Sequence, residues 1–355
     1  MKKVLIKVTA TIFIFLFSGM ISNIYSEEWI EKTVVDKKIE INKNSKLIID
    51  HEFGSLRCKN WDQDAISVKA IVRVKTDDAQ KADEIINNIS IDVKGNKNEV
   101  VATCDLNQKK FGNNQTQVSI DFEIYMPETI SLEMDHQFGN AYIESVSGPT
   151  SISSEYGSIE IVSLTNDVND IEIQFSEINI NNIANGELEI SYSHLDLDEG
   201  VDLSIESEYS DISIGKAKSI SIEVEGGSVS IGEVEDLDGE TSFASFKILS
   251  ISRTLSVETD YGSLTIKNVD KDFSSITVDN EFGAVSIGVD EGSTYKFNAE
   301  GEYCHFNYPK DLANISYRKE SHLATSIKGI IGNGSNPSSI LSVTSEYGSV
   351  NITTK

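Results

Sequence analysis

The stretch "SEYGSIEI", residues 154–161, decides the fold, because close copies of it recur along the chain. "TDYGSLTI" begins at Thr259, "DNEFGAVSI" at Asp279 and "SEYGSVNI" at Ser345. Self-similarity of this kind is the signature of a repeat architecture, in which one short structural unit is used many times. We therefore interpret this stretch as a structural repeat motif rather than as a binding or catalytic site.

Twelve copies align on an aromatic residue that is followed by a small one. The aromatic position is occupied by Phe53, Phe138, Tyr156, Phe175, Tyr192, Tyr209, Phe243, Tyr261, Phe282, Tyr303 and Tyr347, and Gly226 replaces it in the remaining copy. From Phe138 to Tyr303 the steps between copies are 18, 19, 17, 17, 17, 17, 18, 21 and 21 residues. So regular a spacing predicts one continuous stack of units.

Apolar residues alternate with polar ones on both sides of the aromatic position. Ile152 precedes Tyr156, and Ile159 and Ile161 follow it. This period of two predicts strands with one buried face. A unit this short cannot close a core alone, but stacked units can share one. We expect an all-β fold, a parallel β-helix or β-solenoid, with an antiparallel sandwich as the alternative.

The aromatic residues could face either way. A bend at the small residue would turn Tyr156 inward with Ile152, and we favour this interior position. A straight strand would place the ring outside, where successive rings could stack against sugars. We expect the small residue itself where backbones pack closely or adopt unusual angles. The residues of an external binding face would be Tyr156, Tyr192, Tyr209 and Tyr261, with Asp260, Glu281 and Glu302.

Acidic residues precede the aromatic position in eight of the twelve copies. Stacking places Asp260, Glu281 and Glu302 on adjacent units. Hard cations such as Ca²⁺ take carboxylate oxygens, but the calcium-binding nonapeptide of β-solenoids is absent. We expect a solvated acidic edge with no metal or cofactor. The net charge of −27 also disfavours nucleic acid and anionic lipid surfaces as partners.

The first residues of the chain resemble a targeting segment. Residues 1–26 hold three lysines ahead of an apolar core, which is typical of a secretory signal peptide. Its removal would move the net charge from −27 to −30. No later stretch is apolar enough to span a bilayer, so we expect an exported protein of the periplasm, the outer surface or the medium.

The remaining chain divides into three predicted segments. Residues 27–135 should form a β-rich N-terminal cap with one helix near Thr76 and a hairpin that turns at Gly95. Residues 136–308 should form the solenoid repeats. Residues 309–355 should loop out and then form a final unit.

Cysteines and histidines offer few candidate sites. Cys58 and Cys104 could pair in an oxidising compartment, and Cys304 should be a small, free thiol. His51 and His136 both precede "FG" copies and could approach each other. A metal site there is the weaker interpretation, and we expect solvated edge residues.

The repeats resemble the bacterial putative-adhesin family of unknown function, whose stacked strands carry a recurrent aromatic/Ser-Gly-x-Ile-x-Ile phrase. The closing stretch "GIIGNGSNPSSILSVTSEYGSVNI" is similar to the end typical of that family. The resemblance implies an exported, non-catalytic envelope or surface protein that presents a binding face to a protein or a glycan. Two alternatives remain: a polysaccharide lyase or hydrolase on the same scaffold, and a periplasmic partner in envelope-stress regulation.

Overall fold

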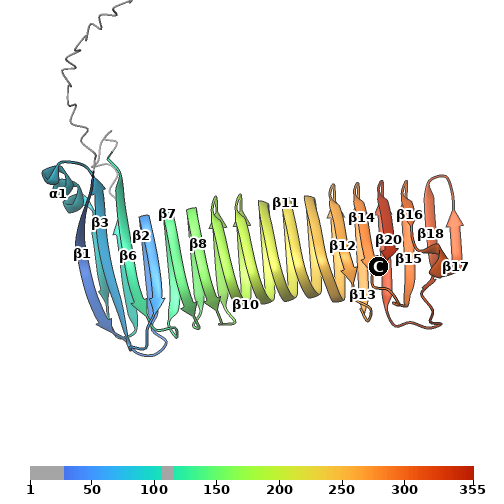
Figure 1. The fold of residues 1–355 in the computed structure, drawn as a ribbon, viewed down its shortest axis with the longest axis horizontal. Helices are drawn as coiled ribbons and strands as arrows, with labels where there is room; N and C mark the ends of the chain where they lie inside the picture. Colours follow the sequence, from blue (N-terminus) through green and yellow to red (C-terminus); the bar gives the residue numbers. More distant parts are fainter. Residues whose placement is uncertain (1–27, 106–115) are drawn as a thin grey trace, which may run out of the picture.

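The computed structural model describes residues 28–105 and 116–355 as an elongated rod (Figure 1). The protein is all-β with one α-helix, and its strands join one large mixed sheet. The predicted signal peptide lies outside the described residues. Within the described ranges, no helix has the length and apolar character needed to cross a membrane.

Strands in the middle of the rod pair in parallel with the copies before and after them. These strands are β7 (Ser131–Val146), β8 (Thr150–Leu164), β9 (Asn169–Gln174), β10 (Glu177–Ser191) and β11 (His194–Asp260). Ile159 pairs with Ile178, which pairs in turn with Leu195, so the register equals the copy spacing. Figure 1 shows β11 winding through successive turns that lie side by side.

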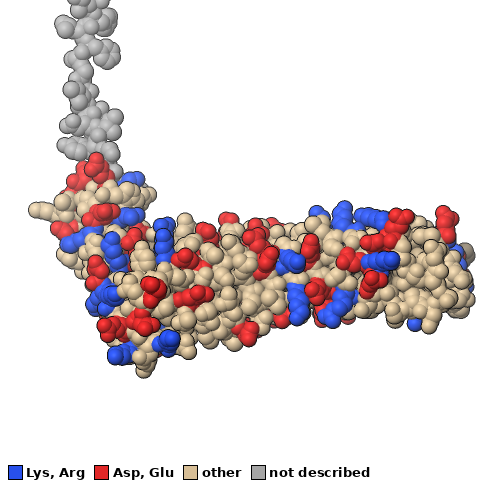
Figure 2. All heavy atoms as spheres, turned by 60° about the horizontal axis from the view of Figure 1, so that its bottom comes forward, with Lys and Arg blue, Asp and Glu red and all other residues tan. Residues whose placement is uncertain are grey.

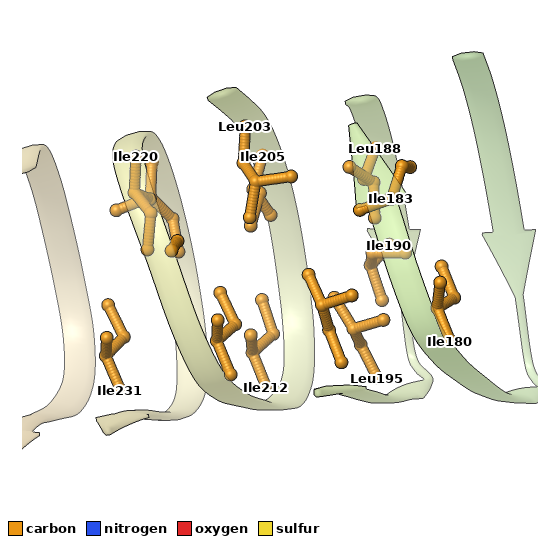
Figure 3. Packing of buried hydrophobic residues seen from close by; sticks show 14 of the residues in the cluster. Ile180, Ile183, Leu188, Ile190, Leu195, Leu203, Ile205, Ile212, Ile220 and Ile231 are labelled. Carbon is orange, nitrogen blue, oxygen red and sulfur yellow. The ribbon is translucent and has the colours of Figure 1, made fainter. Parts of the chain in front are cut away.

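The core is the shared interior of these copies. Figure 3 shows Ile180, Leu195, Ile212 and Ile231 following one another between the strands, and all four are buried. Burying each such side chain contributes about 1.5–3 kcal/mol relative to leaving it in water. The alternation predicted from the sequence is therefore confirmed for the apolar positions.

Antiparallel strands and the helix cover the N-terminal end of the stack. This end contains β1 (Trp29–Glu40), β2 (Lys46–Asn60), β3 (Ala65–Lys75), α1 (Ala79–Asn88), β4 (Ser90–Gly95), β5 (Glu99–Asp105) and β6 (Val118–Met126). β2 pairs in parallel with β7, whereas β3 is antiparallel to both β6 and β1. The Asp78 carboxylate caps α1, and β4 and β5 form a hairpin, so the predicted helix and hairpin are confirmed.

The C-terminal end contains a hairpin where the sequence suggested a loop. The elements are β12 (Ser263–Val269), β13 (Ser275–Glu281), β14 (Ala284–Val289), β15 (Tyr295–Glu302), β16 (His305–Asn307), the short 3₁₀ helix η2 (Lys310–Leu312), β17 (Ala313–Glu320), β18 (Ala324–Ile331), β19 (Ile340–Glu346) and β20 (Ser349–Thr354). β17 and β18 pair antiparallel, and β18 covers one edge of β15. The expectation that this stretch loops out was wrong.

The last copy does not stack at the end of the series. β19 pairs in parallel with β13 on one side and with β15 on the other. Because β18 pairs with the outer edge of β15, the inner edge of β15 is left to pair with β19, which comes later in the chain. The last copy therefore lies between two earlier ones, and the antiparallel hairpin closes the end.

Candidate functional site

The aromatic residues form a ladder on the outside of the rod. All eleven adopt left-handed backbone angles, with φ between 48° and 56°. Ten of the rings are 40–64 % exposed, and Phe53 is half-buried. The expectation that the rings lie in the interior was wrong.

The left-handed residue explains the outward direction. Ile152 and Ser154 point inward before Tyr156, and Ile159 and Ile161 point inward after it. The inward-pointing residues therefore have even numbers before Tyr156 and odd numbers after it. A left-handed residue turns the chain at this point, at a cost of about 1–2 kcal/mol for a side chain other than glycine.

The small residue beside each ring allows the backbones of neighbouring copies to approach. A Cβ added at Gly139 would lie 1.8 Å from the carbonyl oxygen of Gly54. Serine occupies this position in three copies and forms its own hydrogen bonds. The Ser193 hydroxyl accepts a hydrogen bond from the Ser176 N–H at 3.0 Å and donates one to the Ser191 carbonyl at 2.7 Å. Close backbone packing is confirmed, whereas the unusual angle belongs to the aromatic residue in eleven of the twelve copies.

The rings stack face to face along the ladder. Ring centroids are 4.8 Å apart at Phe53–Phe138 and 4.7 Å apart at Tyr261–Phe282, with interplanar angles of 5° and 4°. Stacked pairs of this kind contribute about 0.5–1.5 kcal/mol each beyond area burial. Each face of an internal ring is therefore used by its neighbour. The ladder presents ring edges to solvent, which does not suit the stacking of sugar rings along it.

The predicted binding-face residues lie together, with one change of order. Tyr156, Tyr192, Tyr209 and Tyr261 all belong to the ladder. Asp260 and Glu281 are direct neighbours, but Glu346 lies between Glu281 and Glu302. The expectation that Glu281 and Glu302 are on adjacent units was wrong, because the last copy is inserted there.

A second acidic row lies three residues before the rings, and sequence reasoning missed it. Ten of the twelve copies carry an acid there: Asp50, Asp135, Glu172, Glu189, Glu206, Glu223, Glu240, Glu258, Asp279 and Glu300. The side chains of this row are exposed in the middle copies. Aligning the copies three places before the ring would have revealed the row.

The two acidic rows line a series of grooves next to the ladder. Three grooves of about 280, 310 and 400 Å³ follow one another, and Glu240 lines all three. No lysine or arginine lines any of them. Partial burial, and then the charges of Glu172 and Glu206, raise the pKa of Glu189.

Basic residues are distributed unevenly along the chain. The sequence has no lysine or arginine between Lys110 and Lys216. In Figure 2, basic side chains gather toward the N-terminal end and over the C-terminal half of the rod, and acidic ones are spread along it. Within the described residues, no three His, Cys, Asp or Glu side chains are grouped closely enough to hold a metal ion.

Another groove, of about 600 Å³, lies over the first copies and has mixed charge. Arg57 and Lys59 line it together with Glu160 and Glu177, and Tyr142 lies between them. Arg57 pairs in register with Tyr142, which pairs with Glu160. Opposite charges share this groove, so it has no clear preference for a charged ligand.

His51 and His136 are fully buried, so the expectation of solvated edge residues was wrong. Their Nδ1 atoms are 3.0 Å apart, and the His51 Nε2–H donates to the Ile120 carbonyl at 2.8 Å. His51 Nδ1 must then accept from the Nδ1–H of His136, which requires the His51 ring to be neutral. Burial, and then the neighbouring His136, lower the pKa of His51 to about 4. Burial also lowers the pKa of His136.

The cysteines are all free thiols, so the pairing of Cys58 with Cys104 is excluded. Burial raises the pKa of both thiols to about 12. The Cys104 sulfur instead accepts a hydrogen bond from the Glu52 N–H at 3.2 Å. Cys304 is half-buried and free, as expected. Thiols protonated to this degree are structural rather than reactive.

Comparison with known proteins gives only distant likenesses. No family model and no curated protein matches the chain. Among solved structures, it is similar to a putative cell adhesion protein from Clostridium sporogenes, with 11 % identity, a TM-score of 0.19, and coverage of 92 % of this chain and 100 % of that one. A putative adhesin from Parabacteroides distasonis shows 12 % identity, a TM-score of 0.34 and coverage of 92 % and 97 %.

A putative adhesin from Parabacteroides merdae shows 11 % identity, a TM-score of 0.31 and coverage of 73 % of this chain and 92 % of that one. TM-scores this low do not establish a common overall arrangement. We therefore base the function on the residues of this chain.

Proposed function

We propose that this is a non-catalytic, exported surface protein of the putative-adhesin kind, a β-solenoid that presents one long face to a partner. The face consists of the aromatic ladder and the two acidic rows beside it, and we name it the acidic face. Parallel pairing at the copy spacing supports the solenoid. The observation that carries the function is the exposure of stacked rings along the rod, next to grooves lined by glutamates.

The acidic face favours a protein partner over a glycan. Ring faces, which sugars need for stacking, are already used within the ladder. Ring edges and carboxylates remain, and they suit basic side chains of another protein. The predicted export of residues 27–355 after cleavage is part of this proposal, because such a partner would lie in the envelope or outside the cell.

The test compares capture of envelope proteins by two variants with the same change in charge. The first combines Glu206→Gln, Glu223→Gln and Glu240→Gln on the acidic face. The control combines Asp196→Asn, Glu199→Gln and Asp202→Asn, which are exposed and do not line the acidic grooves. We expect the first variant to lose most of the captured material and the control to retain it. Equal capture by both variants would remove the acidic face from the proposal.

A further inference from the structure

The ladder is interrupted at one described copy, where Gly226 replaces the ring. Gly226 has φ +74°, the same left-handed conformation as the aromatic residues. The backbone of the copy is therefore retained, and only the ring is missing. Phe243 stacks on Tyr261 on one side, at 5.1 Å, and has no ring partner on the Gly226 side.

The surroundings of the two rings beside the interruption differ from each other. The plane of the Tyr209 ring is tilted by 17° from that of Tyr192. The Tyr209 ring lies over Gly226, because a Cβ added at Gly226 would be 2.7 Å from Tyr209 Cδ1. The Tyr209 hydroxyl donates a hydrogen bond to Glu225 at 3.2 Å. Phe243 is 64 % exposed, more than any other ring of the ladder. An open aromatic face is thus available at Phe243, whereas internal rings have none.

The backbones on the two sides of the interruption are farther apart than the thickness of one planar group requires. Two ladder steps separate the backbone positions of Tyr209 and Phe243, roughly 10 Å at the strand spacing. A planar group needs about 3.5 Å on each of its faces. Beside it lies the groove of about 310 Å³, which Phe243 lines together with Glu206, Glu208, Glu223, Glu225 and Glu240.

We infer that this interruption receives the guanidinium group of an arginine in a partner protein. The inference rests on the proposed function and specifies the chemistry of the partner. A guanidinium is flat, stacks on an aromatic face and pairs with carboxylates through several N–H groups. A lysine ammonium cannot stack as a plane, and a neutral aromatic side chain gains nothing from five surrounding carboxylates. The occupant that matches both the open ring and the charge is arginine.

The experiment measures the affinity of two Gly/Ser peptides, one with three arginines and the other with three lysines at the same positions. Titrations use the full exported chain at about 150 mM salt, which screens long-range attraction. We expect the arginine peptide to bind about tenfold more tightly, the scale of one stacked, charge-paired contact. Gly226→Phe, which completes the ladder, should reduce this ratio to about one.

Two substitutions of ladder phenylalanines provide the matched control. Phe243→Ser removes the open face, whereas Phe175→Ser removes a ring that is stacked on both sides. The preference for arginine should disappear in the first variant and persist in the second. Equal affinities of the two peptides for the unmodified chain, or an unchanged ratio in Phe243→Ser, would overturn the inference.

These outcomes are separate from those of the proposed function. If the acidic face captures partners but shows no preference for arginine, the proposed function stands and the inference fails. If neutralising Glu206, Glu223 and Glu240 leaves capture unchanged, the proposed function fails, whatever the peptides show.

Discussion

The inward position two residues before each ring is filled differently in the middle of the rod and at its ends. In the middle, Ile173, Ile190 and Val224 pack against the core, and the copies among them carry Ser207 and Thr241, whose buried hydroxyl groups have no hydrogen-bond partner. At the C-terminal end the Thr259 hydroxyl donates to Asn280, and the Asn280 amide donates to Ser345, at 3.0 and 2.9 Å. The comparison teaches that the interior accepts single small hydroxyl groups in the middle, whereas the larger polar side chains at the ends bond one another from copy to copy.

The N-terminal end follows the same rule with titratable groups. His51 and His136 occupy the inward position in neighbouring copies and hydrogen-bond to each other. Their bond requires a neutral His51 ring, whereas the amide and hydroxyl groups at the other end do not titrate in this range. The two ends should therefore respond differently to pH, and the middle should tolerate no charge at all.

The largest expected effect is a charge placed in the middle. Ile231→Asp, or Ile212→Asp, would bury a carboxylate among apolar side chains and should lower the free energy of unfolding by about 4 kcal/mol or more. Glu208→Gln on the exposed acidic face should change it by less than about 0.5 kcal/mol. Chemical denaturation measures both. Tolerance of the aspartates with loss of folding in Glu208→Gln would reverse the assignment of inside and outside.

A smaller loss is expected where the polar chain at the C-terminal end is cut. Asn280→Leu leaves the hydroxyl groups of Thr259 and Ser345 without their shared partner, which should cost about 2–3 kcal/mol. Ile190→Leu in the middle keeps the position apolar and should cost less than about 1.5 kcal/mol. Equal losses in the two variants would show that the hydrogen bonds add nothing to packing.

The histidine pair should make stability depend on pH. Between pH 6.5 and about 4 the unfolded chain binds protons at His51 that the folded chain excludes, so the free energy of unfolding falls as the pH falls. The slope for one histidine is about 1.4 kcal/mol per pH unit at most. Replacing both His51 and His136 with leucine should flatten the slope.

Replacing the exposed pair His194 and His305 with glutamine is the control and should leave the slope in place. Denaturation at pH 6.5, 5.5 and 4.5 distinguishes the variants. A slope that survives the leucine replacements would come from other groups and would contradict the role given to the buried pair.

The smallest effect belongs to the ladder itself. Tyr261→Ser loses two stacking contacts and should cost about 1 kcal/mol. Tyr261→Gly loses the same contacts but relieves the left-handed backbone, so it should be more stable than the serine variant by several tenths of a kcal/mol. Thermal unfolding compares the two variants. A less stable glycine variant would show that the left-handed angle carries no cost here.

Much of the fold could be predicted from the sequence, because spacing and alternation are direct consequences of parallel stacking. The apolar positions, the small residue, the helix capped by Asp78 and the hairpin at Gly95 were all predictable. The direction of the rings was not, because a single left-handed residue changes the alternation and a period of two cannot encode it. The burial of His51, by contrast, continues the alternation of Leu47 and Ile49 before the ring, so a period of two could have found it.

The order of the last copies was also beyond the sequence. The copies at Tyr303 and Tyr347 are alike, and nothing local distinguishes their places in the stack. The order is set by the hairpin β17–β18, which occupies the outer edge of β15. Of the candidate site, the acids next to the rings were predicted, and the row three residues earlier and the interruption at Gly226 were missed.

Cysteine cross-linking offers the most direct test of how the copies are arranged. With Cys304 replaced by serine, cysteines are introduced pairwise at Glu281, Glu346 and Glu302. Parallel neighbours have Cα atoms about 4.8 Å apart, within the range of a disulfide, whereas positions two copies apart are about twice as far. We predict that the 281–346 and 346–302 pairs form disulfides under mild oxidation and that the 281–302 pair does not. A disulfide between 281 and 302, with none at 346, would contradict the side-by-side order on which the acidic face depends.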